Sequence, residues 1–154
     1  MRESPDQLTV PPERMTKERY SVLLVDDSED DRLFMGLAIQ ATSRLKVVGE
    51  VGDGEAAIDY LDGQNRFQDR DQHPFPDVVL LDLKMPRKNG HEVLQWLQTR
   101  PFGGLFVAVV SGSFLPEDIA RSKALGADAY FKKGALKEEL QAMINELTQM
   151  LDKA

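Results

Sequence analysis

The chain has no cysteine, only two histidines and no apolar run approaching 18 residues. Without cysteine it can form neither a disulfide framework nor a thiolate metal site. With His73 and His91 alone, a transition-metal site is not expected. The N-terminal stretch "MRESPDQLTV" lacks the apolar centre of a signal peptide, and no segment reads as a membrane span. These absences together indicate a cytoplasmic protein.

Acidic residues also outnumber basic ones, since the chain has 26 Asp and Glu but 19 Lys and Arg, for a net charge of −7. An acidic chain is a poor direct binder of nucleic acid, since that binding depends on neutralising phosphates. It can instead attract cations or basic partner surfaces. Residues 1–19 are rich in proline and charge and are expected to be a flexible N-terminal tail, which leaves one domain over residues 20–154.

Within residues 20–154, short apolar runs alternate five times with helical patterns. The expected strands are 21–26, 45–51, 78–82, 106–111 and 129–131. The expected helices are 29–42, 54–61, 91–99, 116–125 and a last segment with an apolar stripe from Leu136 to Leu151. Continuous apolar strands separated by helices predict an α/β fold with a doubly wound, five-stranded parallel sheet, that is (βα)5.

Several local features refine this prediction. Ser28 is the expected N-cap of the first helix, and the apolar residues at helical spacing along it are Leu33, Leu37, Ala38 and Ala41. His91 is expected to face solvent, and Trp96 to lie off the core stripe of its helix. The segment 64–76 is long for a connection and is read as a tolerated insertion, with a partner-contact surface as the alternative.

Polar groups follow the carboxyl ends of four of these strands, where ligands bind in open parallel sheets. Asp26-Asp27 follows the first strand and Asp82 the third, "SGS" from Ser111 ends the fourth, and Lys132-Lys133 ends the fifth. Each has an ordinary structural reading alone; Asp27, for example, could cap a helix. Their joint placement at one edge is the specific signal.

Three carboxylates at one edge are unfavourable, because two of them about 5 Å apart repel by roughly 3 kcal/mol at an effective dielectric constant of about 20. A hard cation resolves this, and Mg²⁺ suits a site with few carboxylates and a phosphate oxygen. A lysine and a serine hydroxyl would then contact the other phosphoryl oxygens. Every group has a use if Asp82 is a nucleophile that accepts phosphate.

Four stretches, "LLVDDSEDD", "VVLLDLKMPRKNG", "VVSGS" and "GADAYFKK", carry a resemblance to a known family. Together they resemble the receiver domain of bacterial response regulators, the CheY-like family, over about residues 20–150. The resemblance implies a flavodoxin-like receiver fold with strand order 2-1-3-4-5. It also implies that Asp82 is the phospho-acceptor of a two-component phosphorelay, supplied by a sensor histidine kinase or a histidine phosphotransfer domain.

The resemblance also assigns roles to the other residues of the edge. The implied Mg²⁺ ligands are Asp26, Asp27, Asp82 and the main-chain carbonyl of Lys84. The implied phosphate-contacting and switch residues are Ser111, Lys133 and Tyr130. Phosphorylation would change the face made by the helix 116–125, the strand 129–131 and the last helix, to which an unknown downstream protein would bind.

One position departs from the family pattern, because Gly134 follows Lys133 where a proline is usual. We predict a trans Lys133–Gly134 bond, since a cis bond before a non-proline residue costs about 3 kcal/mol, and a more mobile loop. Lys84, Gly112 and Gly134 are the expected modulators of phosphate lifetime.

The expected protein is therefore a stand-alone signalling receiver, not an enzyme beyond self-phosphorylation from small donors and autodephosphorylation. Its segment 64–76 and "LLDLKMPRKNGHEVL" are similar to the receivers that partner phytochrome-type kinases. Two alternatives are a pseudo-receiver, which binds proteins without phosphorylation, and, more remotely, a phosphatase with an Asp nucleophile. Homodimer formation is left open.

Overall fold

The computed structural model describes residues 18–100 and 102–154. Its centre is one five-stranded sheet in the order β2-β1-β3-β4-β5, in which every pairing is parallel. The strands are β1 (Tyr20–Val25), β2 (Leu45–Val51), β3 (Val78–Leu81), β4 (Phe106–Ser111) and β5 (Ala129–Lys132). The doubly wound α/β fold and the strand order 2-1-3-4-5 are confirmed. The predicted tail falls mainly on residues 1–17, which lie outside the described residues.

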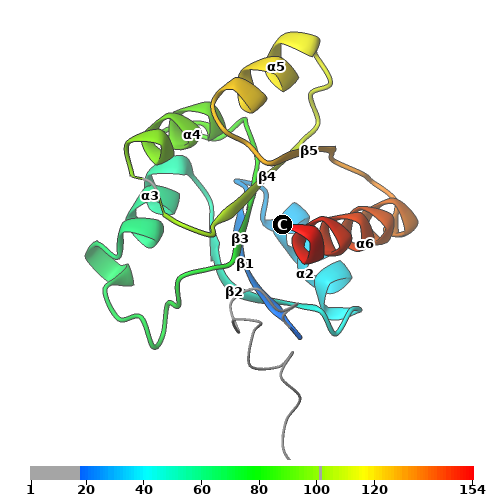
Figure 1. Cartoon of the computed structure of the whole chain (residues 1–154), viewed down its shortest axis with the longest axis horizontal. Helices are drawn as coiled ribbons and strands as arrows, with labels where there is room; N and C mark the ends of the chain where they lie inside the picture. Colours follow the sequence, from blue (N-terminus) through cyan, green and yellow to red (C-terminus); the bar gives the residue numbers. More distant parts are fainter. Residues whose placement is uncertain (1–17, 101) are drawn as a thin grey trace, which may run out of the picture.

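Helices cover both faces of the sheet (Figure 1). They are α2 (Glu29–Gln40), α3 (Gly54–Asp62), α4 (Gly90–Thr99), α5 (Pro116–Ala124) and α6 (Lys137–Lys153), with a 3₁₀ turn η2 (Asn65–Phe67). In Figure 1, α2 and α6 lie together on one side, α3 and α4 on the other, and α5 lies beside α4 near β5. No helix among the described residues is long and apolar enough to span a bilayer.

The alternation of side chains along each strand produces two cores, one on each face. On β1, Val22 and Leu24 pack under α2 and α6, whereas Leu23 and Val25 pack under α3 and α4. The four residues of β3 are all buried. Apolar side chains pack against both faces of β1 and β3, so these two strands are rigidly held. The residues that directly follow them therefore have well-defined positions.

Of the residues predicted at helical spacing along α2, only Ala38 is buried. Leu33 and Leu37 are 56% and 54% exposed, whereas Met35, Ala38 and Ile39 are buried against the sheet. The helix is apolar on more than one side, so that two stripes fit the helical spacing equally well. The helix also ends at Gln40, two residues before the predicted end.

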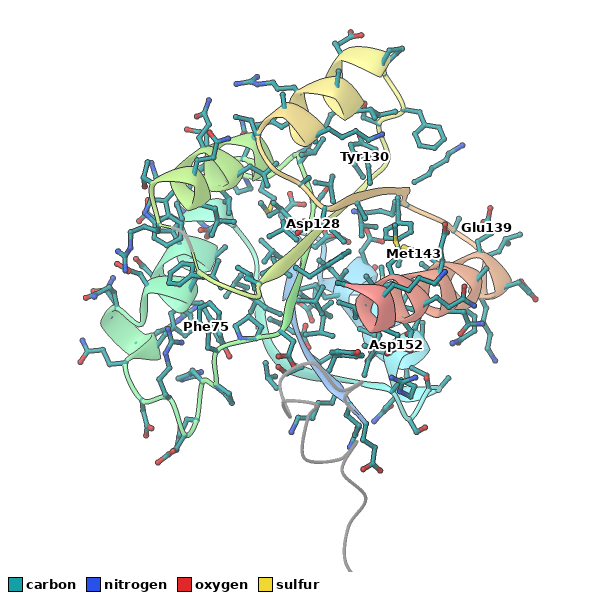
Figure 2. The ribbon with its side chains drawn as sticks, viewed as in Figure 1. Phe75, Asp128, Tyr130, Glu139, Met143 and Asp152 are labelled. Carbon is teal, nitrogen blue, oxygen red and sulfur yellow. The ribbon has the colours of Figure 1, made fainter. Side chains whose placement is uncertain are left out.

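The last helix keeps most of its predicted stripe, including Met143, which projects from α6 toward the sheet (Figure 2). Leu136 is the exception, because it is the N-cap residue of α6 and is 61% exposed. The N-cap predicted at Ser28 is confirmed, and a glycine ends α3. Ser28 accepts a hydrogen bond from the Asp31 amide, and Gly63 ends α3 with a left-handed φ of 66°.

His91 does not face solvent, contrary to the prediction. It is 7% exposed, and its Nε2 lies 3.0 Å from Oγ of the fully buried Ser122, so the pair joins α4 to α5. The close packing of α5 on the first turn of α4 buries a residue that the helix pattern alone leaves outside. Trp96 is half-buried and lies against Phe102, with ring centroids 5.9 Å apart.

The long segment 64–76 is built around Arg70. Its guanidinium donates hydrogen bonds to the main-chain oxygens of Tyr60 and Leu61 at the end of α3, and to that of His73. Phe67 is buried beneath the segment, 5.0 Å from the ring of Tyr60. The segment is therefore fastened to α3, on the side of the sheet away from α2 and α6 (Figure 1).

Candidate functional site

Three carboxylates meet where β1 and β3 end. One oxygen from each of Asp26, Asp27 and Asp82 lies within 4.8 Å of the others. The Asp82 amide donates to the Val25 carbonyl at 2.9 Å, so the end of β3 is fixed to the end of β1. Asp82 is buried, Asp26 is partly buried and Asp27 is exposed. The sequence prediction that these acids share one edge of the sheet is confirmed, and the cluster opens to solvent at Asp27.

Lys133 supplies the positive charge of the site. Its Nζ lies 2.7 Å from Oδ2 of Asp26 and 3.4 Å from Oδ2 of Asp82. It reaches the acids because its amide donates to the Ser111 carbonyl at 2.8 Å, which continues the pairing of β5 with β4. The ammonium is thus held beside the acceptor predicted from the sequence, with only 20% of its side chain exposed.

The protonation of these groups follows from burial and neighbouring charge. Burial raises the pKa of the Asp82 carboxyl above its ordinary value; the Lys133 charge opposes this rise and the Asp26 charge adds to it. Burial of Lys133 disfavours its charged form, but its hydrogen bond to Asp26 and the Asp82 charge outweigh burial and raise its pKa. Lys133 therefore stays charged, whereas burial and the nearby Asp26 charge disfavour the ionised form of Asp82.

Both carboxylate oxygens of Asp26 have hydrogen-bond partners, which fix the orientation of the side chain. Its Oδ1 accepts from the Ser28 amide at 2.9 Å, while Oδ2 faces Lys133. Its main-chain oxygen accepts a hydrogen bond from Arg32 of α2, which also pairs with Glu50 of β2 at 3.2 Å. The start of α2 is therefore tied to the end of β1, which holds the acid pair in place.

The loop after Asp82 is anchored on the first turn of α3. The Gly54 and Glu55 amides donate to the carbonyls of Lys88 and Arg87 at 3.0 and 2.9 Å. The Arg87 guanidinium also pairs with Asp53 at 2.9 Å. A Cβ at Gly54 would lie 2.2 Å from the Lys88 oxygen, so only glycine permits this approach. The loop thus has a defined position beside Asp82.

Ser111 and Tyr130 occupy the neighbouring strands. Ser111 is 1% exposed at the end of β4, and its hydroxyl accepts from the Ser113 amide at 3.1 Å. The Tyr130 hydroxyl donates to the Ser113 carbonyl at 2.7 Å. Tyr130 lies between β5 and α5, as Figure 2 shows. Both predicted switch residues therefore contact the segment that joins β4 to α5, and within the described residues neither is hydrogen-bonded to Asp82.

The predicted modulators lie around this centre. Lys84 is exposed, and its side chain makes no hydrogen bond or ion pair with the other described residues. Gly112 is exposed with open space around it, so a side chain would fit there. Gly134 is half-buried, and no cis peptide bond occurs in the described parts of the chain, so the predicted trans Lys133–Gly134 bond is confirmed.

One residue of the site was missed from the sequence. Oδ2 of Asp31, in the first turn of α2, lies 3.0 Å from Nζ of Lys133. A cavity of about 180 Å³ opens beside this pair and is lined in part by Phe34, Gly134 and Leu140. Asp31 is the last of three successive acids in the first turn of α2, and its placement at the third helical position was the only available signal.

The donor set suits a hard divalent cation. The three clustered groups are carboxylates, and oxygen ligands of this kind are what Mg²⁺ prefers. Two histidines lie elsewhere, His91 buried beside Ser122 and His73 against Phe67, so no nitrogen ligand joins the cluster. The residues present therefore fit Mg²⁺ or a similar ion.

Comparison with known proteins agrees with this geometry. Residues 22–145 match the family described as the response regulator receiver domain. The nitrate/nitrite response regulator NarL of Escherichia coli K12 is 32% identical over 130 residues, which cover 84% of this chain and 55% of NarL. The chain thus spans about half the length of that relative.

Two solved structures are similar over most of the chain. One is the phosphorylated cyanobacterial phytochrome response regulator RcpA, with a TM-score of 0.77 and 29% identity, covering 88% of this chain and 96% of RcpA. The other is the Mn²⁺-bound form of response regulator Rcp1, with a TM-score of 0.67 and 26% identity, covering 87% and 90% of the two chains. The fold therefore has parallels among solved response regulators.

Proposed function

The chain belongs to the response regulator receiver domain family of two-component signalling, and we propose that it accepts a phosphoryl group on Asp82. The observation that carries the proposal is the position of this carboxylate. It follows a fully buried strand, lies within 4.8 Å of two further acids and lies 3.4 Å from the Lys133 ammonium. This combination serves phosphoryl transfer and has no evident use in holding the fold together.

In the proposed reaction, a carboxylate oxygen of Asp82 attacks the phosphorus of a phosphohistidine on a sensor kinase or phosphotransfer domain. A P–O bond forms as the P–N bond breaks, and the histidine nitrogen leaves with the electron pair of that bond. The raised pKa of Asp82, caused first by burial, fits a nucleophile whose ionised form is disfavoured until a cation is bound beside it. The product is an acyl phosphate.

Asp26, Asp27, Asp82 and the main-chain carbonyl of Lys84 would hold Mg²⁺. A bound divalent cation would neutralise the negative charge of the acids and of the incoming phosphoryl oxygens. Rcp1, a response regulator of similar fold, is known in a Mn²⁺-bound form, which supports the binding of a divalent cation by this chain. Of the four proposed ligands, the three carboxylates are already grouped, so little rearrangement of the protein is needed.

Lys133 would bind a second phosphoryl oxygen and Ser111 a third. Ser111 would have to give up its contact with the Ser113 amide, and Tyr130 would lose its acceptor at Ser113 if that segment moved. The movement would alter the face formed by α5, β5 and α6, on which Phe114 and Leu115 are each 55% exposed. A downstream protein would bind this face.

The proposed phosphate source is a sensor kinase of the phytochrome type. Support comes from RcpA, a phytochrome response regulator similar over 88% of this chain. The other reading, a pseudo-receiver that is never phosphorylated, predicts the same fold but no covalent change at Asp82. A phosphatase would release phosphate from a metabolite with turnover.

The test is intact-protein mass spectrometry after incubation with Mg²⁺ and acetyl phosphate. We expect a gain of one phosphoryl group in the wild type and in the exposed-loop control Asp71→Asn, and none in Asp82→Asn. A gain that persists in Asp82→Asn would contradict the assignment of the acceptor. No gain with any small donor or kinase would favour the pseudo-receiver, and release of inorganic phosphate from a metabolite with turnover would favour the phosphatase.

A further inference from the structure

Lys133 has more carboxylate partners than the proposed reaction uses. Its ammonium has three N–H donors, and its Nζ lies 2.7 Å from Asp26, 3.0 Å from Asp31 and 3.4 Å from Asp82. The longest of the three contacts is the one to the proposed acceptor. All the donors of Lys133 are therefore engaged before a phosphoryl group arrives, and mostly with other acids.

Asp31 is the partner without a role in the proposed reaction. Asp26 belongs to the acid cluster and Asp82 is the acceptor, whereas Asp31 is not part of the cluster. Its side chain is 40% exposed, compared with 14% for Asp26 and 8% for Asp82. It thus pulls Lys133 toward the outer side of the site, where the cavity of about 180 Å³ leaves room for the lysine to move.

From this geometry we infer that Asp31 is a positioning residue that withholds Lys133 from Asp82 and so weakens the hold of the site on a phosphoryl group. The inference rests on the proposed function. A phosphoryl group on Asp82 must draw the ammonium away from Asp31 to gain its contact. The Asp31 charge also repels the phosphoryl oxygens, so both effects have the same sign.

The test compares Asp31→Asn with Asp30→Asn. Asparagine keeps the size of the side chain and one acceptor oxygen, so the change removes the negative charge and replaces the other oxygen by an amide donor. Asp30 is an exposed acid in the same first turn of α2 and has no contact with Lys133 among the described residues. Loss of charge near the helix N-terminus is therefore matched in the two variants. Asp31→Glu restores the charge.

The probe is beryllofluoride, a phosphoryl mimic, titrated at saturating Mg²⁺ and followed by ¹⁹F NMR. We expect Asp31→Asn to bind it about two- to fivefold more tightly than the wild type, the size expected for a half-exposed ion pair. Asp30→Asn should match the wild type, and Asp31→Glu should lie close to it. The difference should shrink at about 1 M salt, because exposed charges are screened.

Equal beryllofluoride affinities for Asp31→Asn and Asp30→Asn would overturn the inference. Asp31 would then act only as one of the acids that stabilise the N-terminus of α2. Weaker binding by Asp31→Asn would also overturn it, because Asp31 would then aim Lys133 at the phosphoryl group. If the wild type binds neither beryllofluoride nor phosphate, the proposed function fails. The ¹⁵N signal of the Lys133 ammonium in metal-free protein still tests the contact, since it should shift in Asp31→Asn and not in Asp30→Asn.

Discussion

Replacement of Lys133 by methionine tests how the site tolerates its crowded acids. Methionine keeps an unbranched, flexible side chain but removes the ammonium. Two carboxylates held within 4.8 Å repel by about 3 kcal/mol at an effective dielectric constant of about 20. With the lysine gone, backbone amides still donate to Asp26 and Asp82, but no positively charged side chain among the described residues pairs with either carboxylate in metal-free protein. We expect Lys133→Met to lower the free energy of unfolding by about 2–3 kcal/mol.

The same change should strengthen metal binding. A divalent cation competes with Lys133 for Asp26 and Asp82, which the lysine now contacts at 2.7 and 3.4 Å. We expect the Kd for Mg²⁺ to fall about tenfold, a change of about 1.4 kcal/mol. Saturating Mg²⁺ should then recover much of the lost stability, because binding to the folded state alone stabilises it.

The assay is urea unfolding with and without Mg²⁺, together with calorimetric titration of the metal. Lys132→Met is the matched control, since Lys132 is the adjacent residue, is exposed and has its Nζ 5.2 Å from the centre of the Phe114 ring. If both variants show the same stability and the same Mg²⁺ affinity, the Lys133 ammonium does not balance the acids and the electrostatic account is refuted.

Three further predictions concern stability. Gly54→Ala should lower the free energy of unfolding in urea by about 1–3 kcal/mol, because its Cβ would lie 2.2 Å from the Lys88 oxygen. The control Gly36→Ala, whose Cβ would have nothing within 4 Å, should raise it by about 0.5–1 kcal/mol. Equal effects of the two variants would refute the close approach at Gly54. Burial lowers the pKa of His91 in the folded protein, so as the pH falls the unfolded chain binds a proton at a higher pH than the folded one does. The free energy of unfolding should therefore decrease below about pH 6.5. His91→Gln should reduce the difference between unfolding curves measured at pH 7 and pH 5. Burial raises the pKa of Asp82, so its ionised form costs stability once pH exceeds both pKa values. Asp82→Asn should therefore raise the Tm of metal-free protein at pH 7. Mg²⁺ should narrow that gap, because the wild type keeps all three carboxylate ligands and binds the ion more tightly. A lower Tm for metal-free Asp82→Asn would contradict the prediction.

The sheet and its acidic edge were predictable because both follow from strong local patterns. Buried strands such as "VVLL" of β3 are continuous apolar runs, and parallel strands must place their carboxyl ends at one edge. Asp26, Asp82 and Lys133 therefore had to lie close together once the βα order was recognised. The positions of the residues that follow a rigid strand depend little on side-chain detail.

The orientation of α2 was not predictable in the same way. Its apolar residues include Leu33, Leu37 and Ile39, which do not share one stripe, and only packing under β1 and against α6 selects the buried side. The burial of His91 likewise depends on α5, a helix that begins 25 residues later in the chain. Such contacts between distant elements leave no local periodic signal.

The contact of Asp31 with Lys133 was not predictable, because it depends both on ambiguous local spacing and on the position of a distant strand. Residues 27–31 include four acids and Ser28, and spacing alone does not tell which of these acids faces the lysine. Once Ser28 is fixed as the N-cap, the third residue of the helix turns toward the strand ends, where Lys133 lies 102 residues away in the chain. The N-cap was predicted, but its consequence for Asp31 needed the position of β5.

The central claim, that Asp82 is the residue that accepts phosphate, is tested most directly by locating the modification. The protein is incubated with Mg²⁺ and a phosphorylated kinase or acetyl phosphate, the acyl phosphate is trapped by reduction with borohydride, and the digested peptides are sequenced by mass spectrometry. The account predicts a reduced residue at position 82 and none at Asp26 or Asp27. Modification at either of those acids, or at no aspartate in a protein that is folded and binds Mg²⁺, would contradict it.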